Sequence, residues 1–379
     1  MQKNTVGAYG PYIEKLCGTG PRRLSFRQPR FKNLAAWKKI AMARALACVA
    51  EPPAEKRPKV RVVNSYEMDG LQVQELRWQL SCGPETEALL LRPLGVKGKL
   101  PGIVALHDHG GNKFFGYRKI SRHRETQHPL MVEHQKLYYS GKAWANEIAR
   151  RGYAVLVHDT FPFASRRVLP QDVIEPVRNV AAAVEAVSDA AIGEYNRWAG
   201  GHEHIWAKTL HCAGTTWPAM YLREDRVAVD ILCAQPFVDA KRIGCMGLSG
   251  GGCRTVYLGG LDARIKCAIC VGFMTTHLDL ALQKDWTHTW MTFAPLLPAD
   301  LDFPEILGLR VPLPTMVLNC NEDGLYSLPE MKRADRILGE VYKKAKAADK
   351  YACHFYPGGH KFDLPMQSDA FAWMDKWLQ

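Results

Sequence analysis

Short, almost wholly apolar runs alternate with helix-like segments through most of the chain after Pro101, and this pattern constrains the fold most strongly. The runs are residues 102–106, 153–157, 243–246, 265–271 and 315–318. Strands that are apolar on both faces are typical of a parallel sheet covered by helices on each side. Helices between the runs, such as one expected over 143–151, then act as right-handed crossovers. The sequence therefore predicts an α/β fold with a mostly parallel central sheet flanked by helices.

Further elements are expected on both sides of this pattern. Residues 31–49 carry apolar side chains at helical spacing and precede two prolines, which predicts a helix lying across the sheet. Residues 71–80 and 87–91 are strand-like, and they predict a hairpin at a sheet edge. The remaining elements expected are a helix over 328–347, a last strand over 351–356 and a helix over 368–378.

The net charge of +12 is concentrated at the N-terminus, where residues 1–61 hold 14 Lys and Arg but only 3 Asp and Glu. A basic arm can attract polyanions or anionic membranes. We favour a solvated basic face on an N-terminal cap, and we expect neither nucleic acid nor a membrane as a partner. No apolar stretch approaches the ~18 residues of a membrane span.

The expected location is cytoplasmic. The chain has 11 Cys without the dense spacing of a disulfide-stapled secreted domain, which favours a reducing compartment. Residues 1–20 also lack the apolar core and cleavage site of a signal peptide. The Arg-rich, acid-poor start leaves organelle targeting open.

The strongest chemical signal is Gly-Leu-Ser-Gly-Gly at 247–251, between a strand-like run and a helix-like run over 253–258. A serine at such a sharp turn has an exposed hydroxyl, and flanking glycines avoid a clash in the bend. The N–H of Gly250, at the start of the helix, would face a developing oxyanion. Ser249 is therefore the candidate nucleophile. A Gly-rich packing turn or a phosphate loop is the alternative, although the P-loop Lys is absent.

A serine nucleophile needs a base and a supporting carboxylate. His360 follows the last strand in Tyr-Pro-Gly-Gly-His at 356–360, on a loop at the same sheet edge as Ser249. The segment 319–324 follows the preceding strand and supplies Asp323, which we choose, with Glu322 as the alternative. The chain order is then Ser, Asp, His.

The loop at 106–112, after the first parallel strand, is the candidate for the other half of an oxyanion hole. Its glycines let backbone N–H groups approach a substrate oxygen, and the N–H of His109 or Gly110 is the expected donor. Histidines in this loop and at 202, 204 and 211 raise the alternative of a metal site. Because zinc-type spacing such as H-E-x-x-H is lacking, we predict no metal and no cofactor.

These motifs together resemble the α/β-hydrolase superfamily, in particular its dienelactone-hydrolase-like and acetyl-xylan-esterase-like branch. The segments that carry the resemblance are His-Asp-His-Gly-Gly-Asn-Lys at 107–113, His-Asp-Thr-Phe at 158–161, Gly-Leu-Ser-Gly-Gly-Gly at 247–252, Leu-Asp-Phe-Pro at 301–304, Asn-Glu-Asp-Gly-Leu-Tyr at 321–326 and Pro-Gly-Gly-His at 357–360. The resemblance spans roughly residue 24 to the C-terminus. It implies a serine esterase with Ser249 as nucleophile, Asp323 as acid and His360 as base.

The resemblance fixes the reaction class better than the substrate. Dienelactone hydrolases proper use a cysteine nucleophile, so the serine here implies ordinary carboxylic esters, such as acetylated sugars or small acyl esters. Two alternatives are a serine peptidase on the same fold and a catalytically silent scaffold that binds a ligand. A small-molecule ester is the expected partner, and a homo-oligomer is possible.

The domain organisation follows from the same reading. We expect a basic helical extension over 1–60 that packs on an α/β-hydrolase catalytic domain over 61–379. An insertion over 162–240, which includes an Ala-rich stretch at 180–191, is long enough to cover a site. Five aromatic residues near strand ends are candidates to stack on a sugar or aryl group, or else pack the insertion: Phe161, Trp206, Trp217, Trp286 and Trp290.

Overall fold

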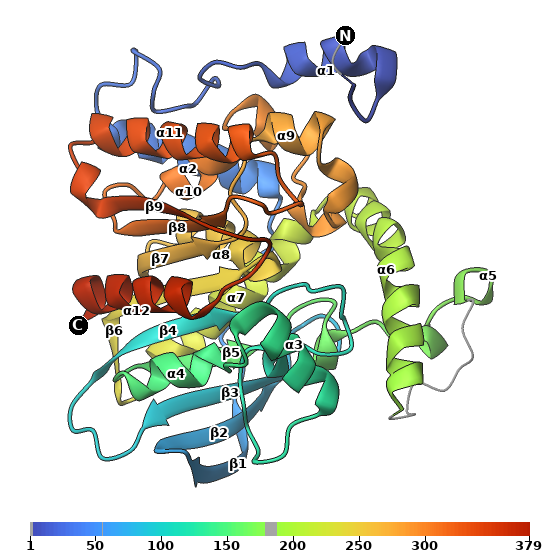
Figure 1. Ribbon diagram of the computed structural model, residues 1–379, viewed down its shortest axis with the longest axis vertical. Helices are drawn as coiled ribbons and strands as arrows, with labels where there is room; N and C mark the ends of the chain where they lie inside the picture. The colour runs from blue at the N-terminus through green and yellow to red at the C-terminus, as the bar shows by residue number, and fades with distance from the viewer. Residues whose placement is uncertain (1–2, 55, 179–187) are drawn as a thin grey trace.

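A nine-stranded sheet forms the centre of the computed structural model, which describes residues 3–54, 56–178 and 188–379 (Figure 1). The strands are β1 (Arg61–Met68), β2 (Leu71–Trp78), β3 (Thr86–Pro93), β4 (Leu100–Leu106), β5 (Ala154–His158), β6 (Val238–Leu248), β7 (Ile265–Val271), β8 (Thr315–Cys320) and β9 (Tyr351–Tyr356). Their spatial order is β1-β2-β3-β5-β4-β6-β7-β8-β9. The six strands from β5 to β9 in this order pair in parallel, whereas β1, β2 and β3 are antiparallel to their neighbours. The predicted mostly parallel sheet is confirmed.

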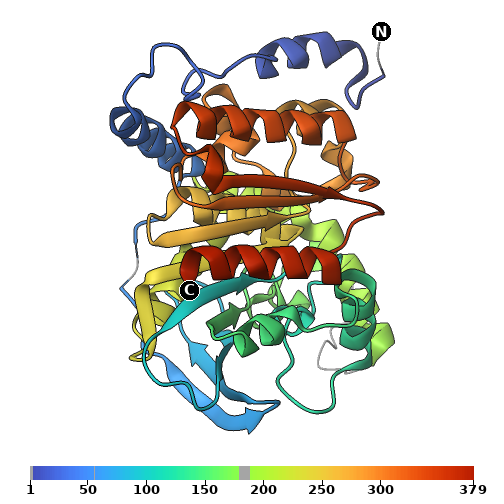
Figure 2. The ribbon, with the colours of Figure 1, turned by 60° about the vertical axis from the view of Figure 1, so that its left-hand side comes forward.

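Helices cover both faces of the sheet (Figure 1 and Figure 2). They are α1 (Gly10–Cys17), α2 (Leu34–Val49), α3 (Pro129–Tyr139), α4 (Trp144–Arg150), α5 (Glu175–Arg178), α6 (Asp189–Cys212), α7 (Trp217–Cys233), α8 (Gly250–Leu261), α9 (His277–Leu282), α10 (Phe303–Gly308), α11 (Leu328–Lys344) and α12 (Leu364–Leu378). Alternate side chains of β4 enter two separate cores: Val104 and Leu106 pack with α7 and α8, and Ile103 and Ala105 pack with α4 and α12. This two-sided burial is why the central strands are apolar throughout.

The predicted hairpin is present as β2 and β3, but it does not lie at the sheet edge. β1 pairs outside β2 and takes the edge position. Its side chains are mostly exposed, and the adjacent Val62 and Val63 both face solvent beside an irregularity in the pairing. Without a buried face, β1 has no alternating apolar pattern, so sequence periodicity could not reveal it.

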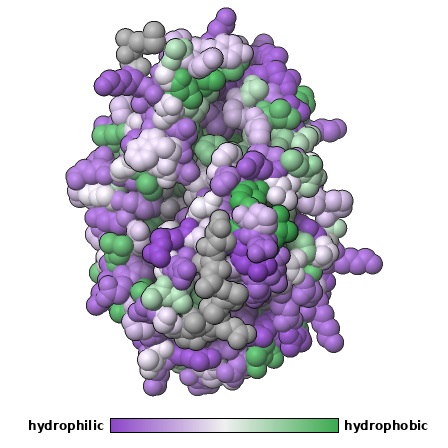
Figure 3. Space-filling model, turned by 90° about the vertical axis from the view of Figure 1, so that its right-hand side faces the viewer, coloured by the Kyte–Doolittle hydropathy of each residue, from purple (hydrophilic) through white to green (hydrophobic). Residues whose placement is uncertain are grey.

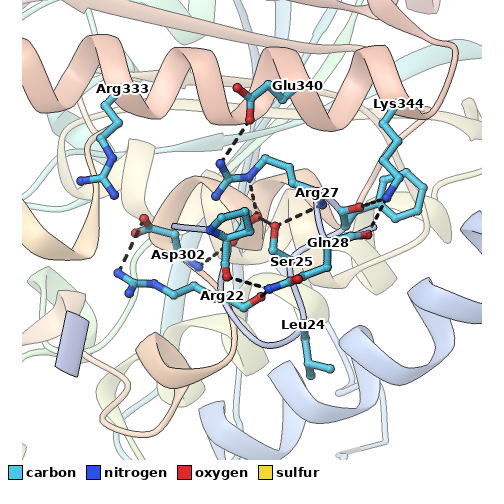
Figure 4. A network of polar contacts seen from close by, with 12 residues as sticks. Arg22, Leu24, Ser25, Arg27, Gln28, Asp302, Arg333, Glu340 and Lys344 are labelled. Atoms are coloured by element: carbon cyan, nitrogen blue, oxygen red, sulfur yellow. Dashed lines mark hydrogen bonds and ion pairs between the residues drawn. The ribbon is translucent and has the colours of Figure 1, made fainter. Parts of the chain in front are cut away.

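The basic N-terminal arm is tied to the core by ion pairs (Figure 4). Arg22 lies 3.8 Å from Asp302, and Arg27 lies 3.2 Å from both Glu305 and Glu340. The acceptors Asp302 and Glu305 are almost fully buried at the start of α10. A second buried carboxylate, Asp300, pairs with Arg23 at 2.5 Å and with Arg44 at 2.6 Å. Four arginines of the arm are therefore paired with carboxylates of this chain: Arg22, Arg23, Arg27 and Arg44. The division into an extension over 1–60 and a catalytic domain over 61–379 stays a prediction.

The segment 162–240 divides into two parts. α6 stands beside the end of the sheet, outside the two helical layers (Figure 1). In contrast, α7 packs directly on β4, β6 and α8 and belongs to the core. Most of the predicted Ala-rich stretch at 180–191 lies outside the described residues. No helix among the described residues is long and apolar enough to cross a membrane.

Candidate active site

Ser249 occupies a sharp turn between β6 and α8. Its backbone has φ 58° and ψ −120°, an unusual conformation for a residue with a side chain. The turn is fixed on both sides, because the Ser249 N–H donates to the carbonyl of Val271 at 2.9 Å and its carbonyl accepts from the Cys253 N–H at 2.8 Å. The strand-to-helix turn predicted from the sequence is present, and Ser249 lines a cavity there.

Glycines beside Ser249 let this turn approach the end of β4. A Cβ atom on Gly247 would lie 2.3 Å from the carbonyl oxygen of Leu106, and one on Gly251 would lie 2.1 Å from the same oxygen. Both distances are well inside van der Waals contact, and the atom met is rigid backbone. Gly247 and Gly251 are therefore required for the loop that follows β4 to lie against the start of α8.

Replacing Gly251 with alanine is expected to lower the free energy of unfolding by at least about 2 kcal/mol, because strand β4 must shift to admit the methyl group. The matched control is Gly339→Ala on α11, where a Cβ meets nothing within 4 Å. That change is expected to stabilise the protein by about 0.5–1 kcal/mol through the unfolded chain. Urea unfolding measures both effects. Equal unfolding midpoints for the two variants would contradict the close approach.

Ser249 and His360 line the same cavity, which has a volume of about 310 Å³. The loop after β4 contributes His109 and Gly110 to its wall. The rest of the wall is largely aromatic and apolar and includes Tyr138, Phe273, His288, Met291 and Leu325. His360 also packs beside the turn, since a Cβ built on Gly272 would lie 3.1 Å from its Cε1 and 2.9 Å from Leu248.

Asp323 holds the imidazole of His360. Its Oδ2 lies 2.6 Å from Nδ1 of His360, and its Oδ1 accepts from the Leu325 N–H at 3.0 Å. Asp323 is only 4% exposed. The two residues follow β8 and β9, which pair in parallel, so both side chains emerge at one edge of the sheet. Since Nδ1 is bound to the carboxylate, Nε2 is the nitrogen left for another partner, and no described residue bonds to it.

Glu322, the alternative carboxylate, has a different place. Its side chain is exposed, and its Oε1 accepts from the Gly358 N–H at 3.3 Å. It therefore braces the loop that carries His360, whereas Asp323 contacts the imidazole itself.

The loop after β4 lies directly against Gly250. A Cβ on Gly250 would be 2.9 Å from the backbone nitrogen of His109. Within the described part of the chain, neither the Gly250 N–H nor the His109 N–H donates a hydrogen bond. The buried Lys119 ammonium donates to the carbonyls of Asp108 and His109 at 2.9 and 2.8 Å, and burial lowers the pKa of Lys119 to about 8. The loop thus has anchored carbonyls, and its free His109 N–H lies beside Gly250 of α8, whose N–H is also free.

The histidines near this loop have protein partners. Nδ1 of His107 lies 3.0 Å from the carbonyl of Asp108, and Nε2 of His109 lies 2.7 Å from Glu203. The His202 ring packs against the Trp198 ring at a tilt, with ring centroids 4.3 Å apart. Among residues 3–54, 56–178 and 188–379, no group of three His, Cys, Asp or Glu side chains is arranged to hold a metal ion.

None of the five aromatic residues predicted to bind substrate lines this cavity. Phe161, Trp206 and Trp217 instead pack on one another, with ring centroids 5.4 to 6.2 Å apart, and the two tryptophans are buried. Trp286 and Trp290 line a neighbouring cavity of about 580 Å³. The sequence places such residues near strand ends, but the direction of each side chain depends on packing that the sequence pattern does not encode.

The residues that do line the cavity were missed for a related reason. Tyr138 comes from α3, and His288 and Met291 come from short turns after α9, where no motif marks them. Phe273 follows the end of β7 and could have been found from its position alone. Burial lowers the pKa of His288 to about 4, and its Nε2 lies 3.1 Å from the carbonyl of Leu325. Its ring is therefore neutral near pH 7.

Comparison with known proteins agrees with the fold. No protein-family model matches the chain. The chain is 23% identical to "Putative hydrolase YtaP" of Bacillus subtilis over 328 residues. The matched region covers 86% of this chain and 94% of that protein.

The chain is also similar in structure to proteins of known structure. The chain matches a "putative acetyl xylan esterase" from Bacteroides fragilis with a TM-score of 0.65 and 17% identity, over 93% of this chain and 82% of the other. It matches a glucuronoyl esterase from Solibacter usitatus with a TM-score of 0.65 and 14% identity, over 94% and 97%. The chain has the α/β-hydrolase fold, as the sequence predicted.

Proposed function

We propose that the protein is a serine-dependent hydrolase of carboxylic esters. The observation that carries this proposal is that Ser249, on a strained turn, shares a cavity with a His360 whose Nδ1 is held by the buried Asp323. The similarity to hydrolases and carbohydrate esterases adds support. Nothing in the cavity specifically favours a peptidase or a silent binding protein.

The proposed reaction has two halves. Nε2 of His360 takes the proton of the Ser249 hydroxyl as Oγ attacks the ester carbonyl, and the resulting imidazolium is stabilised by Asp323. The N–H groups of Gly250 and His109 stabilise the oxyanion. His360 then protonates the departing alcohol, which leaves an acyl-enzyme. Water, deprotonated by the same imidazole, releases the carboxylic acid and restores Ser249.

A panel of esters tests this proposal. We expect the wild-type protein to hydrolyse short-chain p-nitrophenyl esters and acetylated saccharides, with a preference for small acyl groups because the cavity is only about 310 Å³. Failure to hydrolyse any member of the panel would contradict the proposal. The cytoplasmic location and the possible homo-oligomer stay predictions.

An acetylated carbohydrate is the substrate class that we propose. Trp286 and Trp290 are 74% and 42% exposed on the wall of the neighbouring cavity, which shares His288 with the cavity of Ser249. The segment 285–293 separates the two cavities, with Thr287, Thr289 and Met291 on one side and the two tryptophans on the other. An exposed indole offers a flat apolar face on which a sugar ring beyond the ester can stack.

Replacing Trp286 with alanine is therefore expected to raise KM for an acetylated xylo-oligosaccharide about 3- to 10-fold, which corresponds to ~0.5–1.5 kcal/mol of stacking. KM for p-nitrophenyl acetate should not change, because that ester does not reach the second cavity. The matched control is Trp377→Ala on α12, outside both cavities. Equal effects on both substrates, or none on either, would rule out this sugar site.

A further inference from the structure

Helix α6 contacts the loop at residues 107–114, which we call the oxyanion loop, from outside the helical layers (Figure 1). The face of the molecule on which α6 lies has a mostly hydrophilic surface with smaller apolar patches (Figure 3). Behind that surface, α6 carries the half-buried Asn196 and the buried Glu203, about two helical turns apart. Both residues bond to the oxyanion loop.

Glu203 binds two side chains of the loop. Its Oε1 lies 2.7 Å from Nε2 of His109 and also pairs with the ammonium group of Lys113. The side chains of Glu203 and Lys113 are 9% and 1% exposed. Burial works against the Glu203 carboxylate, but its bonds to His109 and Lys113 outweigh burial and lower its pKa to about 2. Glu203 is therefore an ionised, nearly buried anchor.

The hydrogen bonds of His109 fix the tautomer and orientation of its ring. The Gly111 N–H donates to Nδ1 at 3.1 Å, so Nδ1 carries no proton. The proton then lies on Nε2, which donates to Glu203. Burial and the nearby Lys113 ammonium lower the pKa of His109 to about 4, so the ring stays neutral near pH 7. Both ring nitrogens are thus held, and the backbone N–H of the same residue lies beside Gly250.

Asn196 provides the second attachment. Its Oδ1 accepts from the backbone N–H groups of Lys113 at 2.8 Å and Phe114 at 3.0 Å. We propose that α6 positions the oxyanion loop, with Glu203 as the positioning residue that aims the N–H of His109 at the developing oxyanion. This inference rests on the proposed esterase function. Because the oxyanion forms only in the transition state, Glu203 acts on kcat and not on KM.

Glu203→Ala tests the inference in the full-length protein with p-nitrophenyl acetate. We expect kcat to fall about 10- to 100-fold, less than the 10²–10³-fold cost of deleting an oxyanion donor, with KM within about 2-fold. The matched control is Glu194→Ala, an exposed carboxylate on the same helix, which should leave both constants unchanged. The double variant Glu203→Gln with Lys113→Met keeps an acceptor for His109 and leaves no unpaired buried charge, so its kcat should return to within about 5-fold of wild type.

Amide hydrogen exchange gives a readout that needs no substrate. Exchange over residues 107–114 should accelerate in Glu203→Ala and stay at the wild-type rate in Glu194→Ala. Unchanged exchange in Glu203→Ala, or a loss confined to KM, would overturn the positioning role. A third outcome separates the two proposals: the wild-type protein hydrolyses no ester, but exchange in Glu203→Ala is still faster than in the wild type. That result would overturn the proposed function, and with it the effect on kcat, while leaving the attachment of the loop to α6 intact.

Discussion

Replacing Ser249 with alanine is expected to reduce the turnover of p-nitrophenyl acetate about 10⁶-fold, by analogy with the deletion of nucleophiles in known Ser-His-Asp enzymes. The variant retains the oxyanion loop and the cavity, which act on the ester only through binding and charge stabilisation. KM should therefore change little, and the remaining activity should exceed the uncatalysed rate only about 10³–10⁴-fold. Steady-state kinetics of the purified variant measure this loss.

The loss must be specific to this hydroxyl. Ser368→Ala, on the exposed side of α12, removes an equivalent group away from the cavity and should leave kcat unchanged. Thermal unfolding should show that Ser249→Ala remains folded. Because Ser249 has φ 58°, a modest change in Tm of either sign is compatible with the prediction. Turnover within about 100-fold of wild type in a folded Ser249→Ala protein would remove the serine from the reaction.

Asp323→Asn should have the second largest effect, a loss of about 10⁴-fold in kcat. The carboxylate accepts the Nδ1 proton of His360 at 2.6 Å, which leaves Nε2 free to take the serine proton. An amide can donate to Nδ1 and so favour the opposite tautomer, in which Nε2 is already protonated. It also cannot stabilise the imidazolium. Steady-state kinetics with the same ester measure this loss.

The matched comparison is Glu322→Gln. Its amide oxygen can still accept from the Gly358 N–H, and the side chain is exposed, so kcat should stay within about 2-fold of wild type. The reverse outcome, with full activity in Asp323→Asn and none in Glu322→Gln, would show that Glu322 supports the imidazole of His360.

The predictable parts of the fold and the site share one physical cause. Strands buried on both faces leave apolar runs that periodicity detects, and parallel strands deliver their following loops to one edge of the sheet. That rule brought together Ser249, Asp323 and His360 from positions far apart in the sequence. The edge strand β1, whose side chains are mostly exposed and show no apolar alternation, has no such signal.

Contacts between distant segments were beyond sequence reasoning. Ser25 of the arm bonds to Glu305, about 280 residues away, so the arm's charge could be located in the sequence but its partners could not. Trp206 and Trp217 were predicted near strand ends, but they lie on α6 and α7, where their rings pack against each other. No sequence motif marks Glu203, and its bond to His109 depends on where α6 lies.

The most direct test of the central claim is labelling with a fluorophosphonate, which reacts with a serine hydroxyl only when a nearby base activates it. Peptide mapping of the labelled protein should find the adduct on Ser249, and His360→Ala should label far more slowly. An adduct on a different residue, or equal labelling of wild type and His360→Ala, would contradict activation of Ser249 by His360.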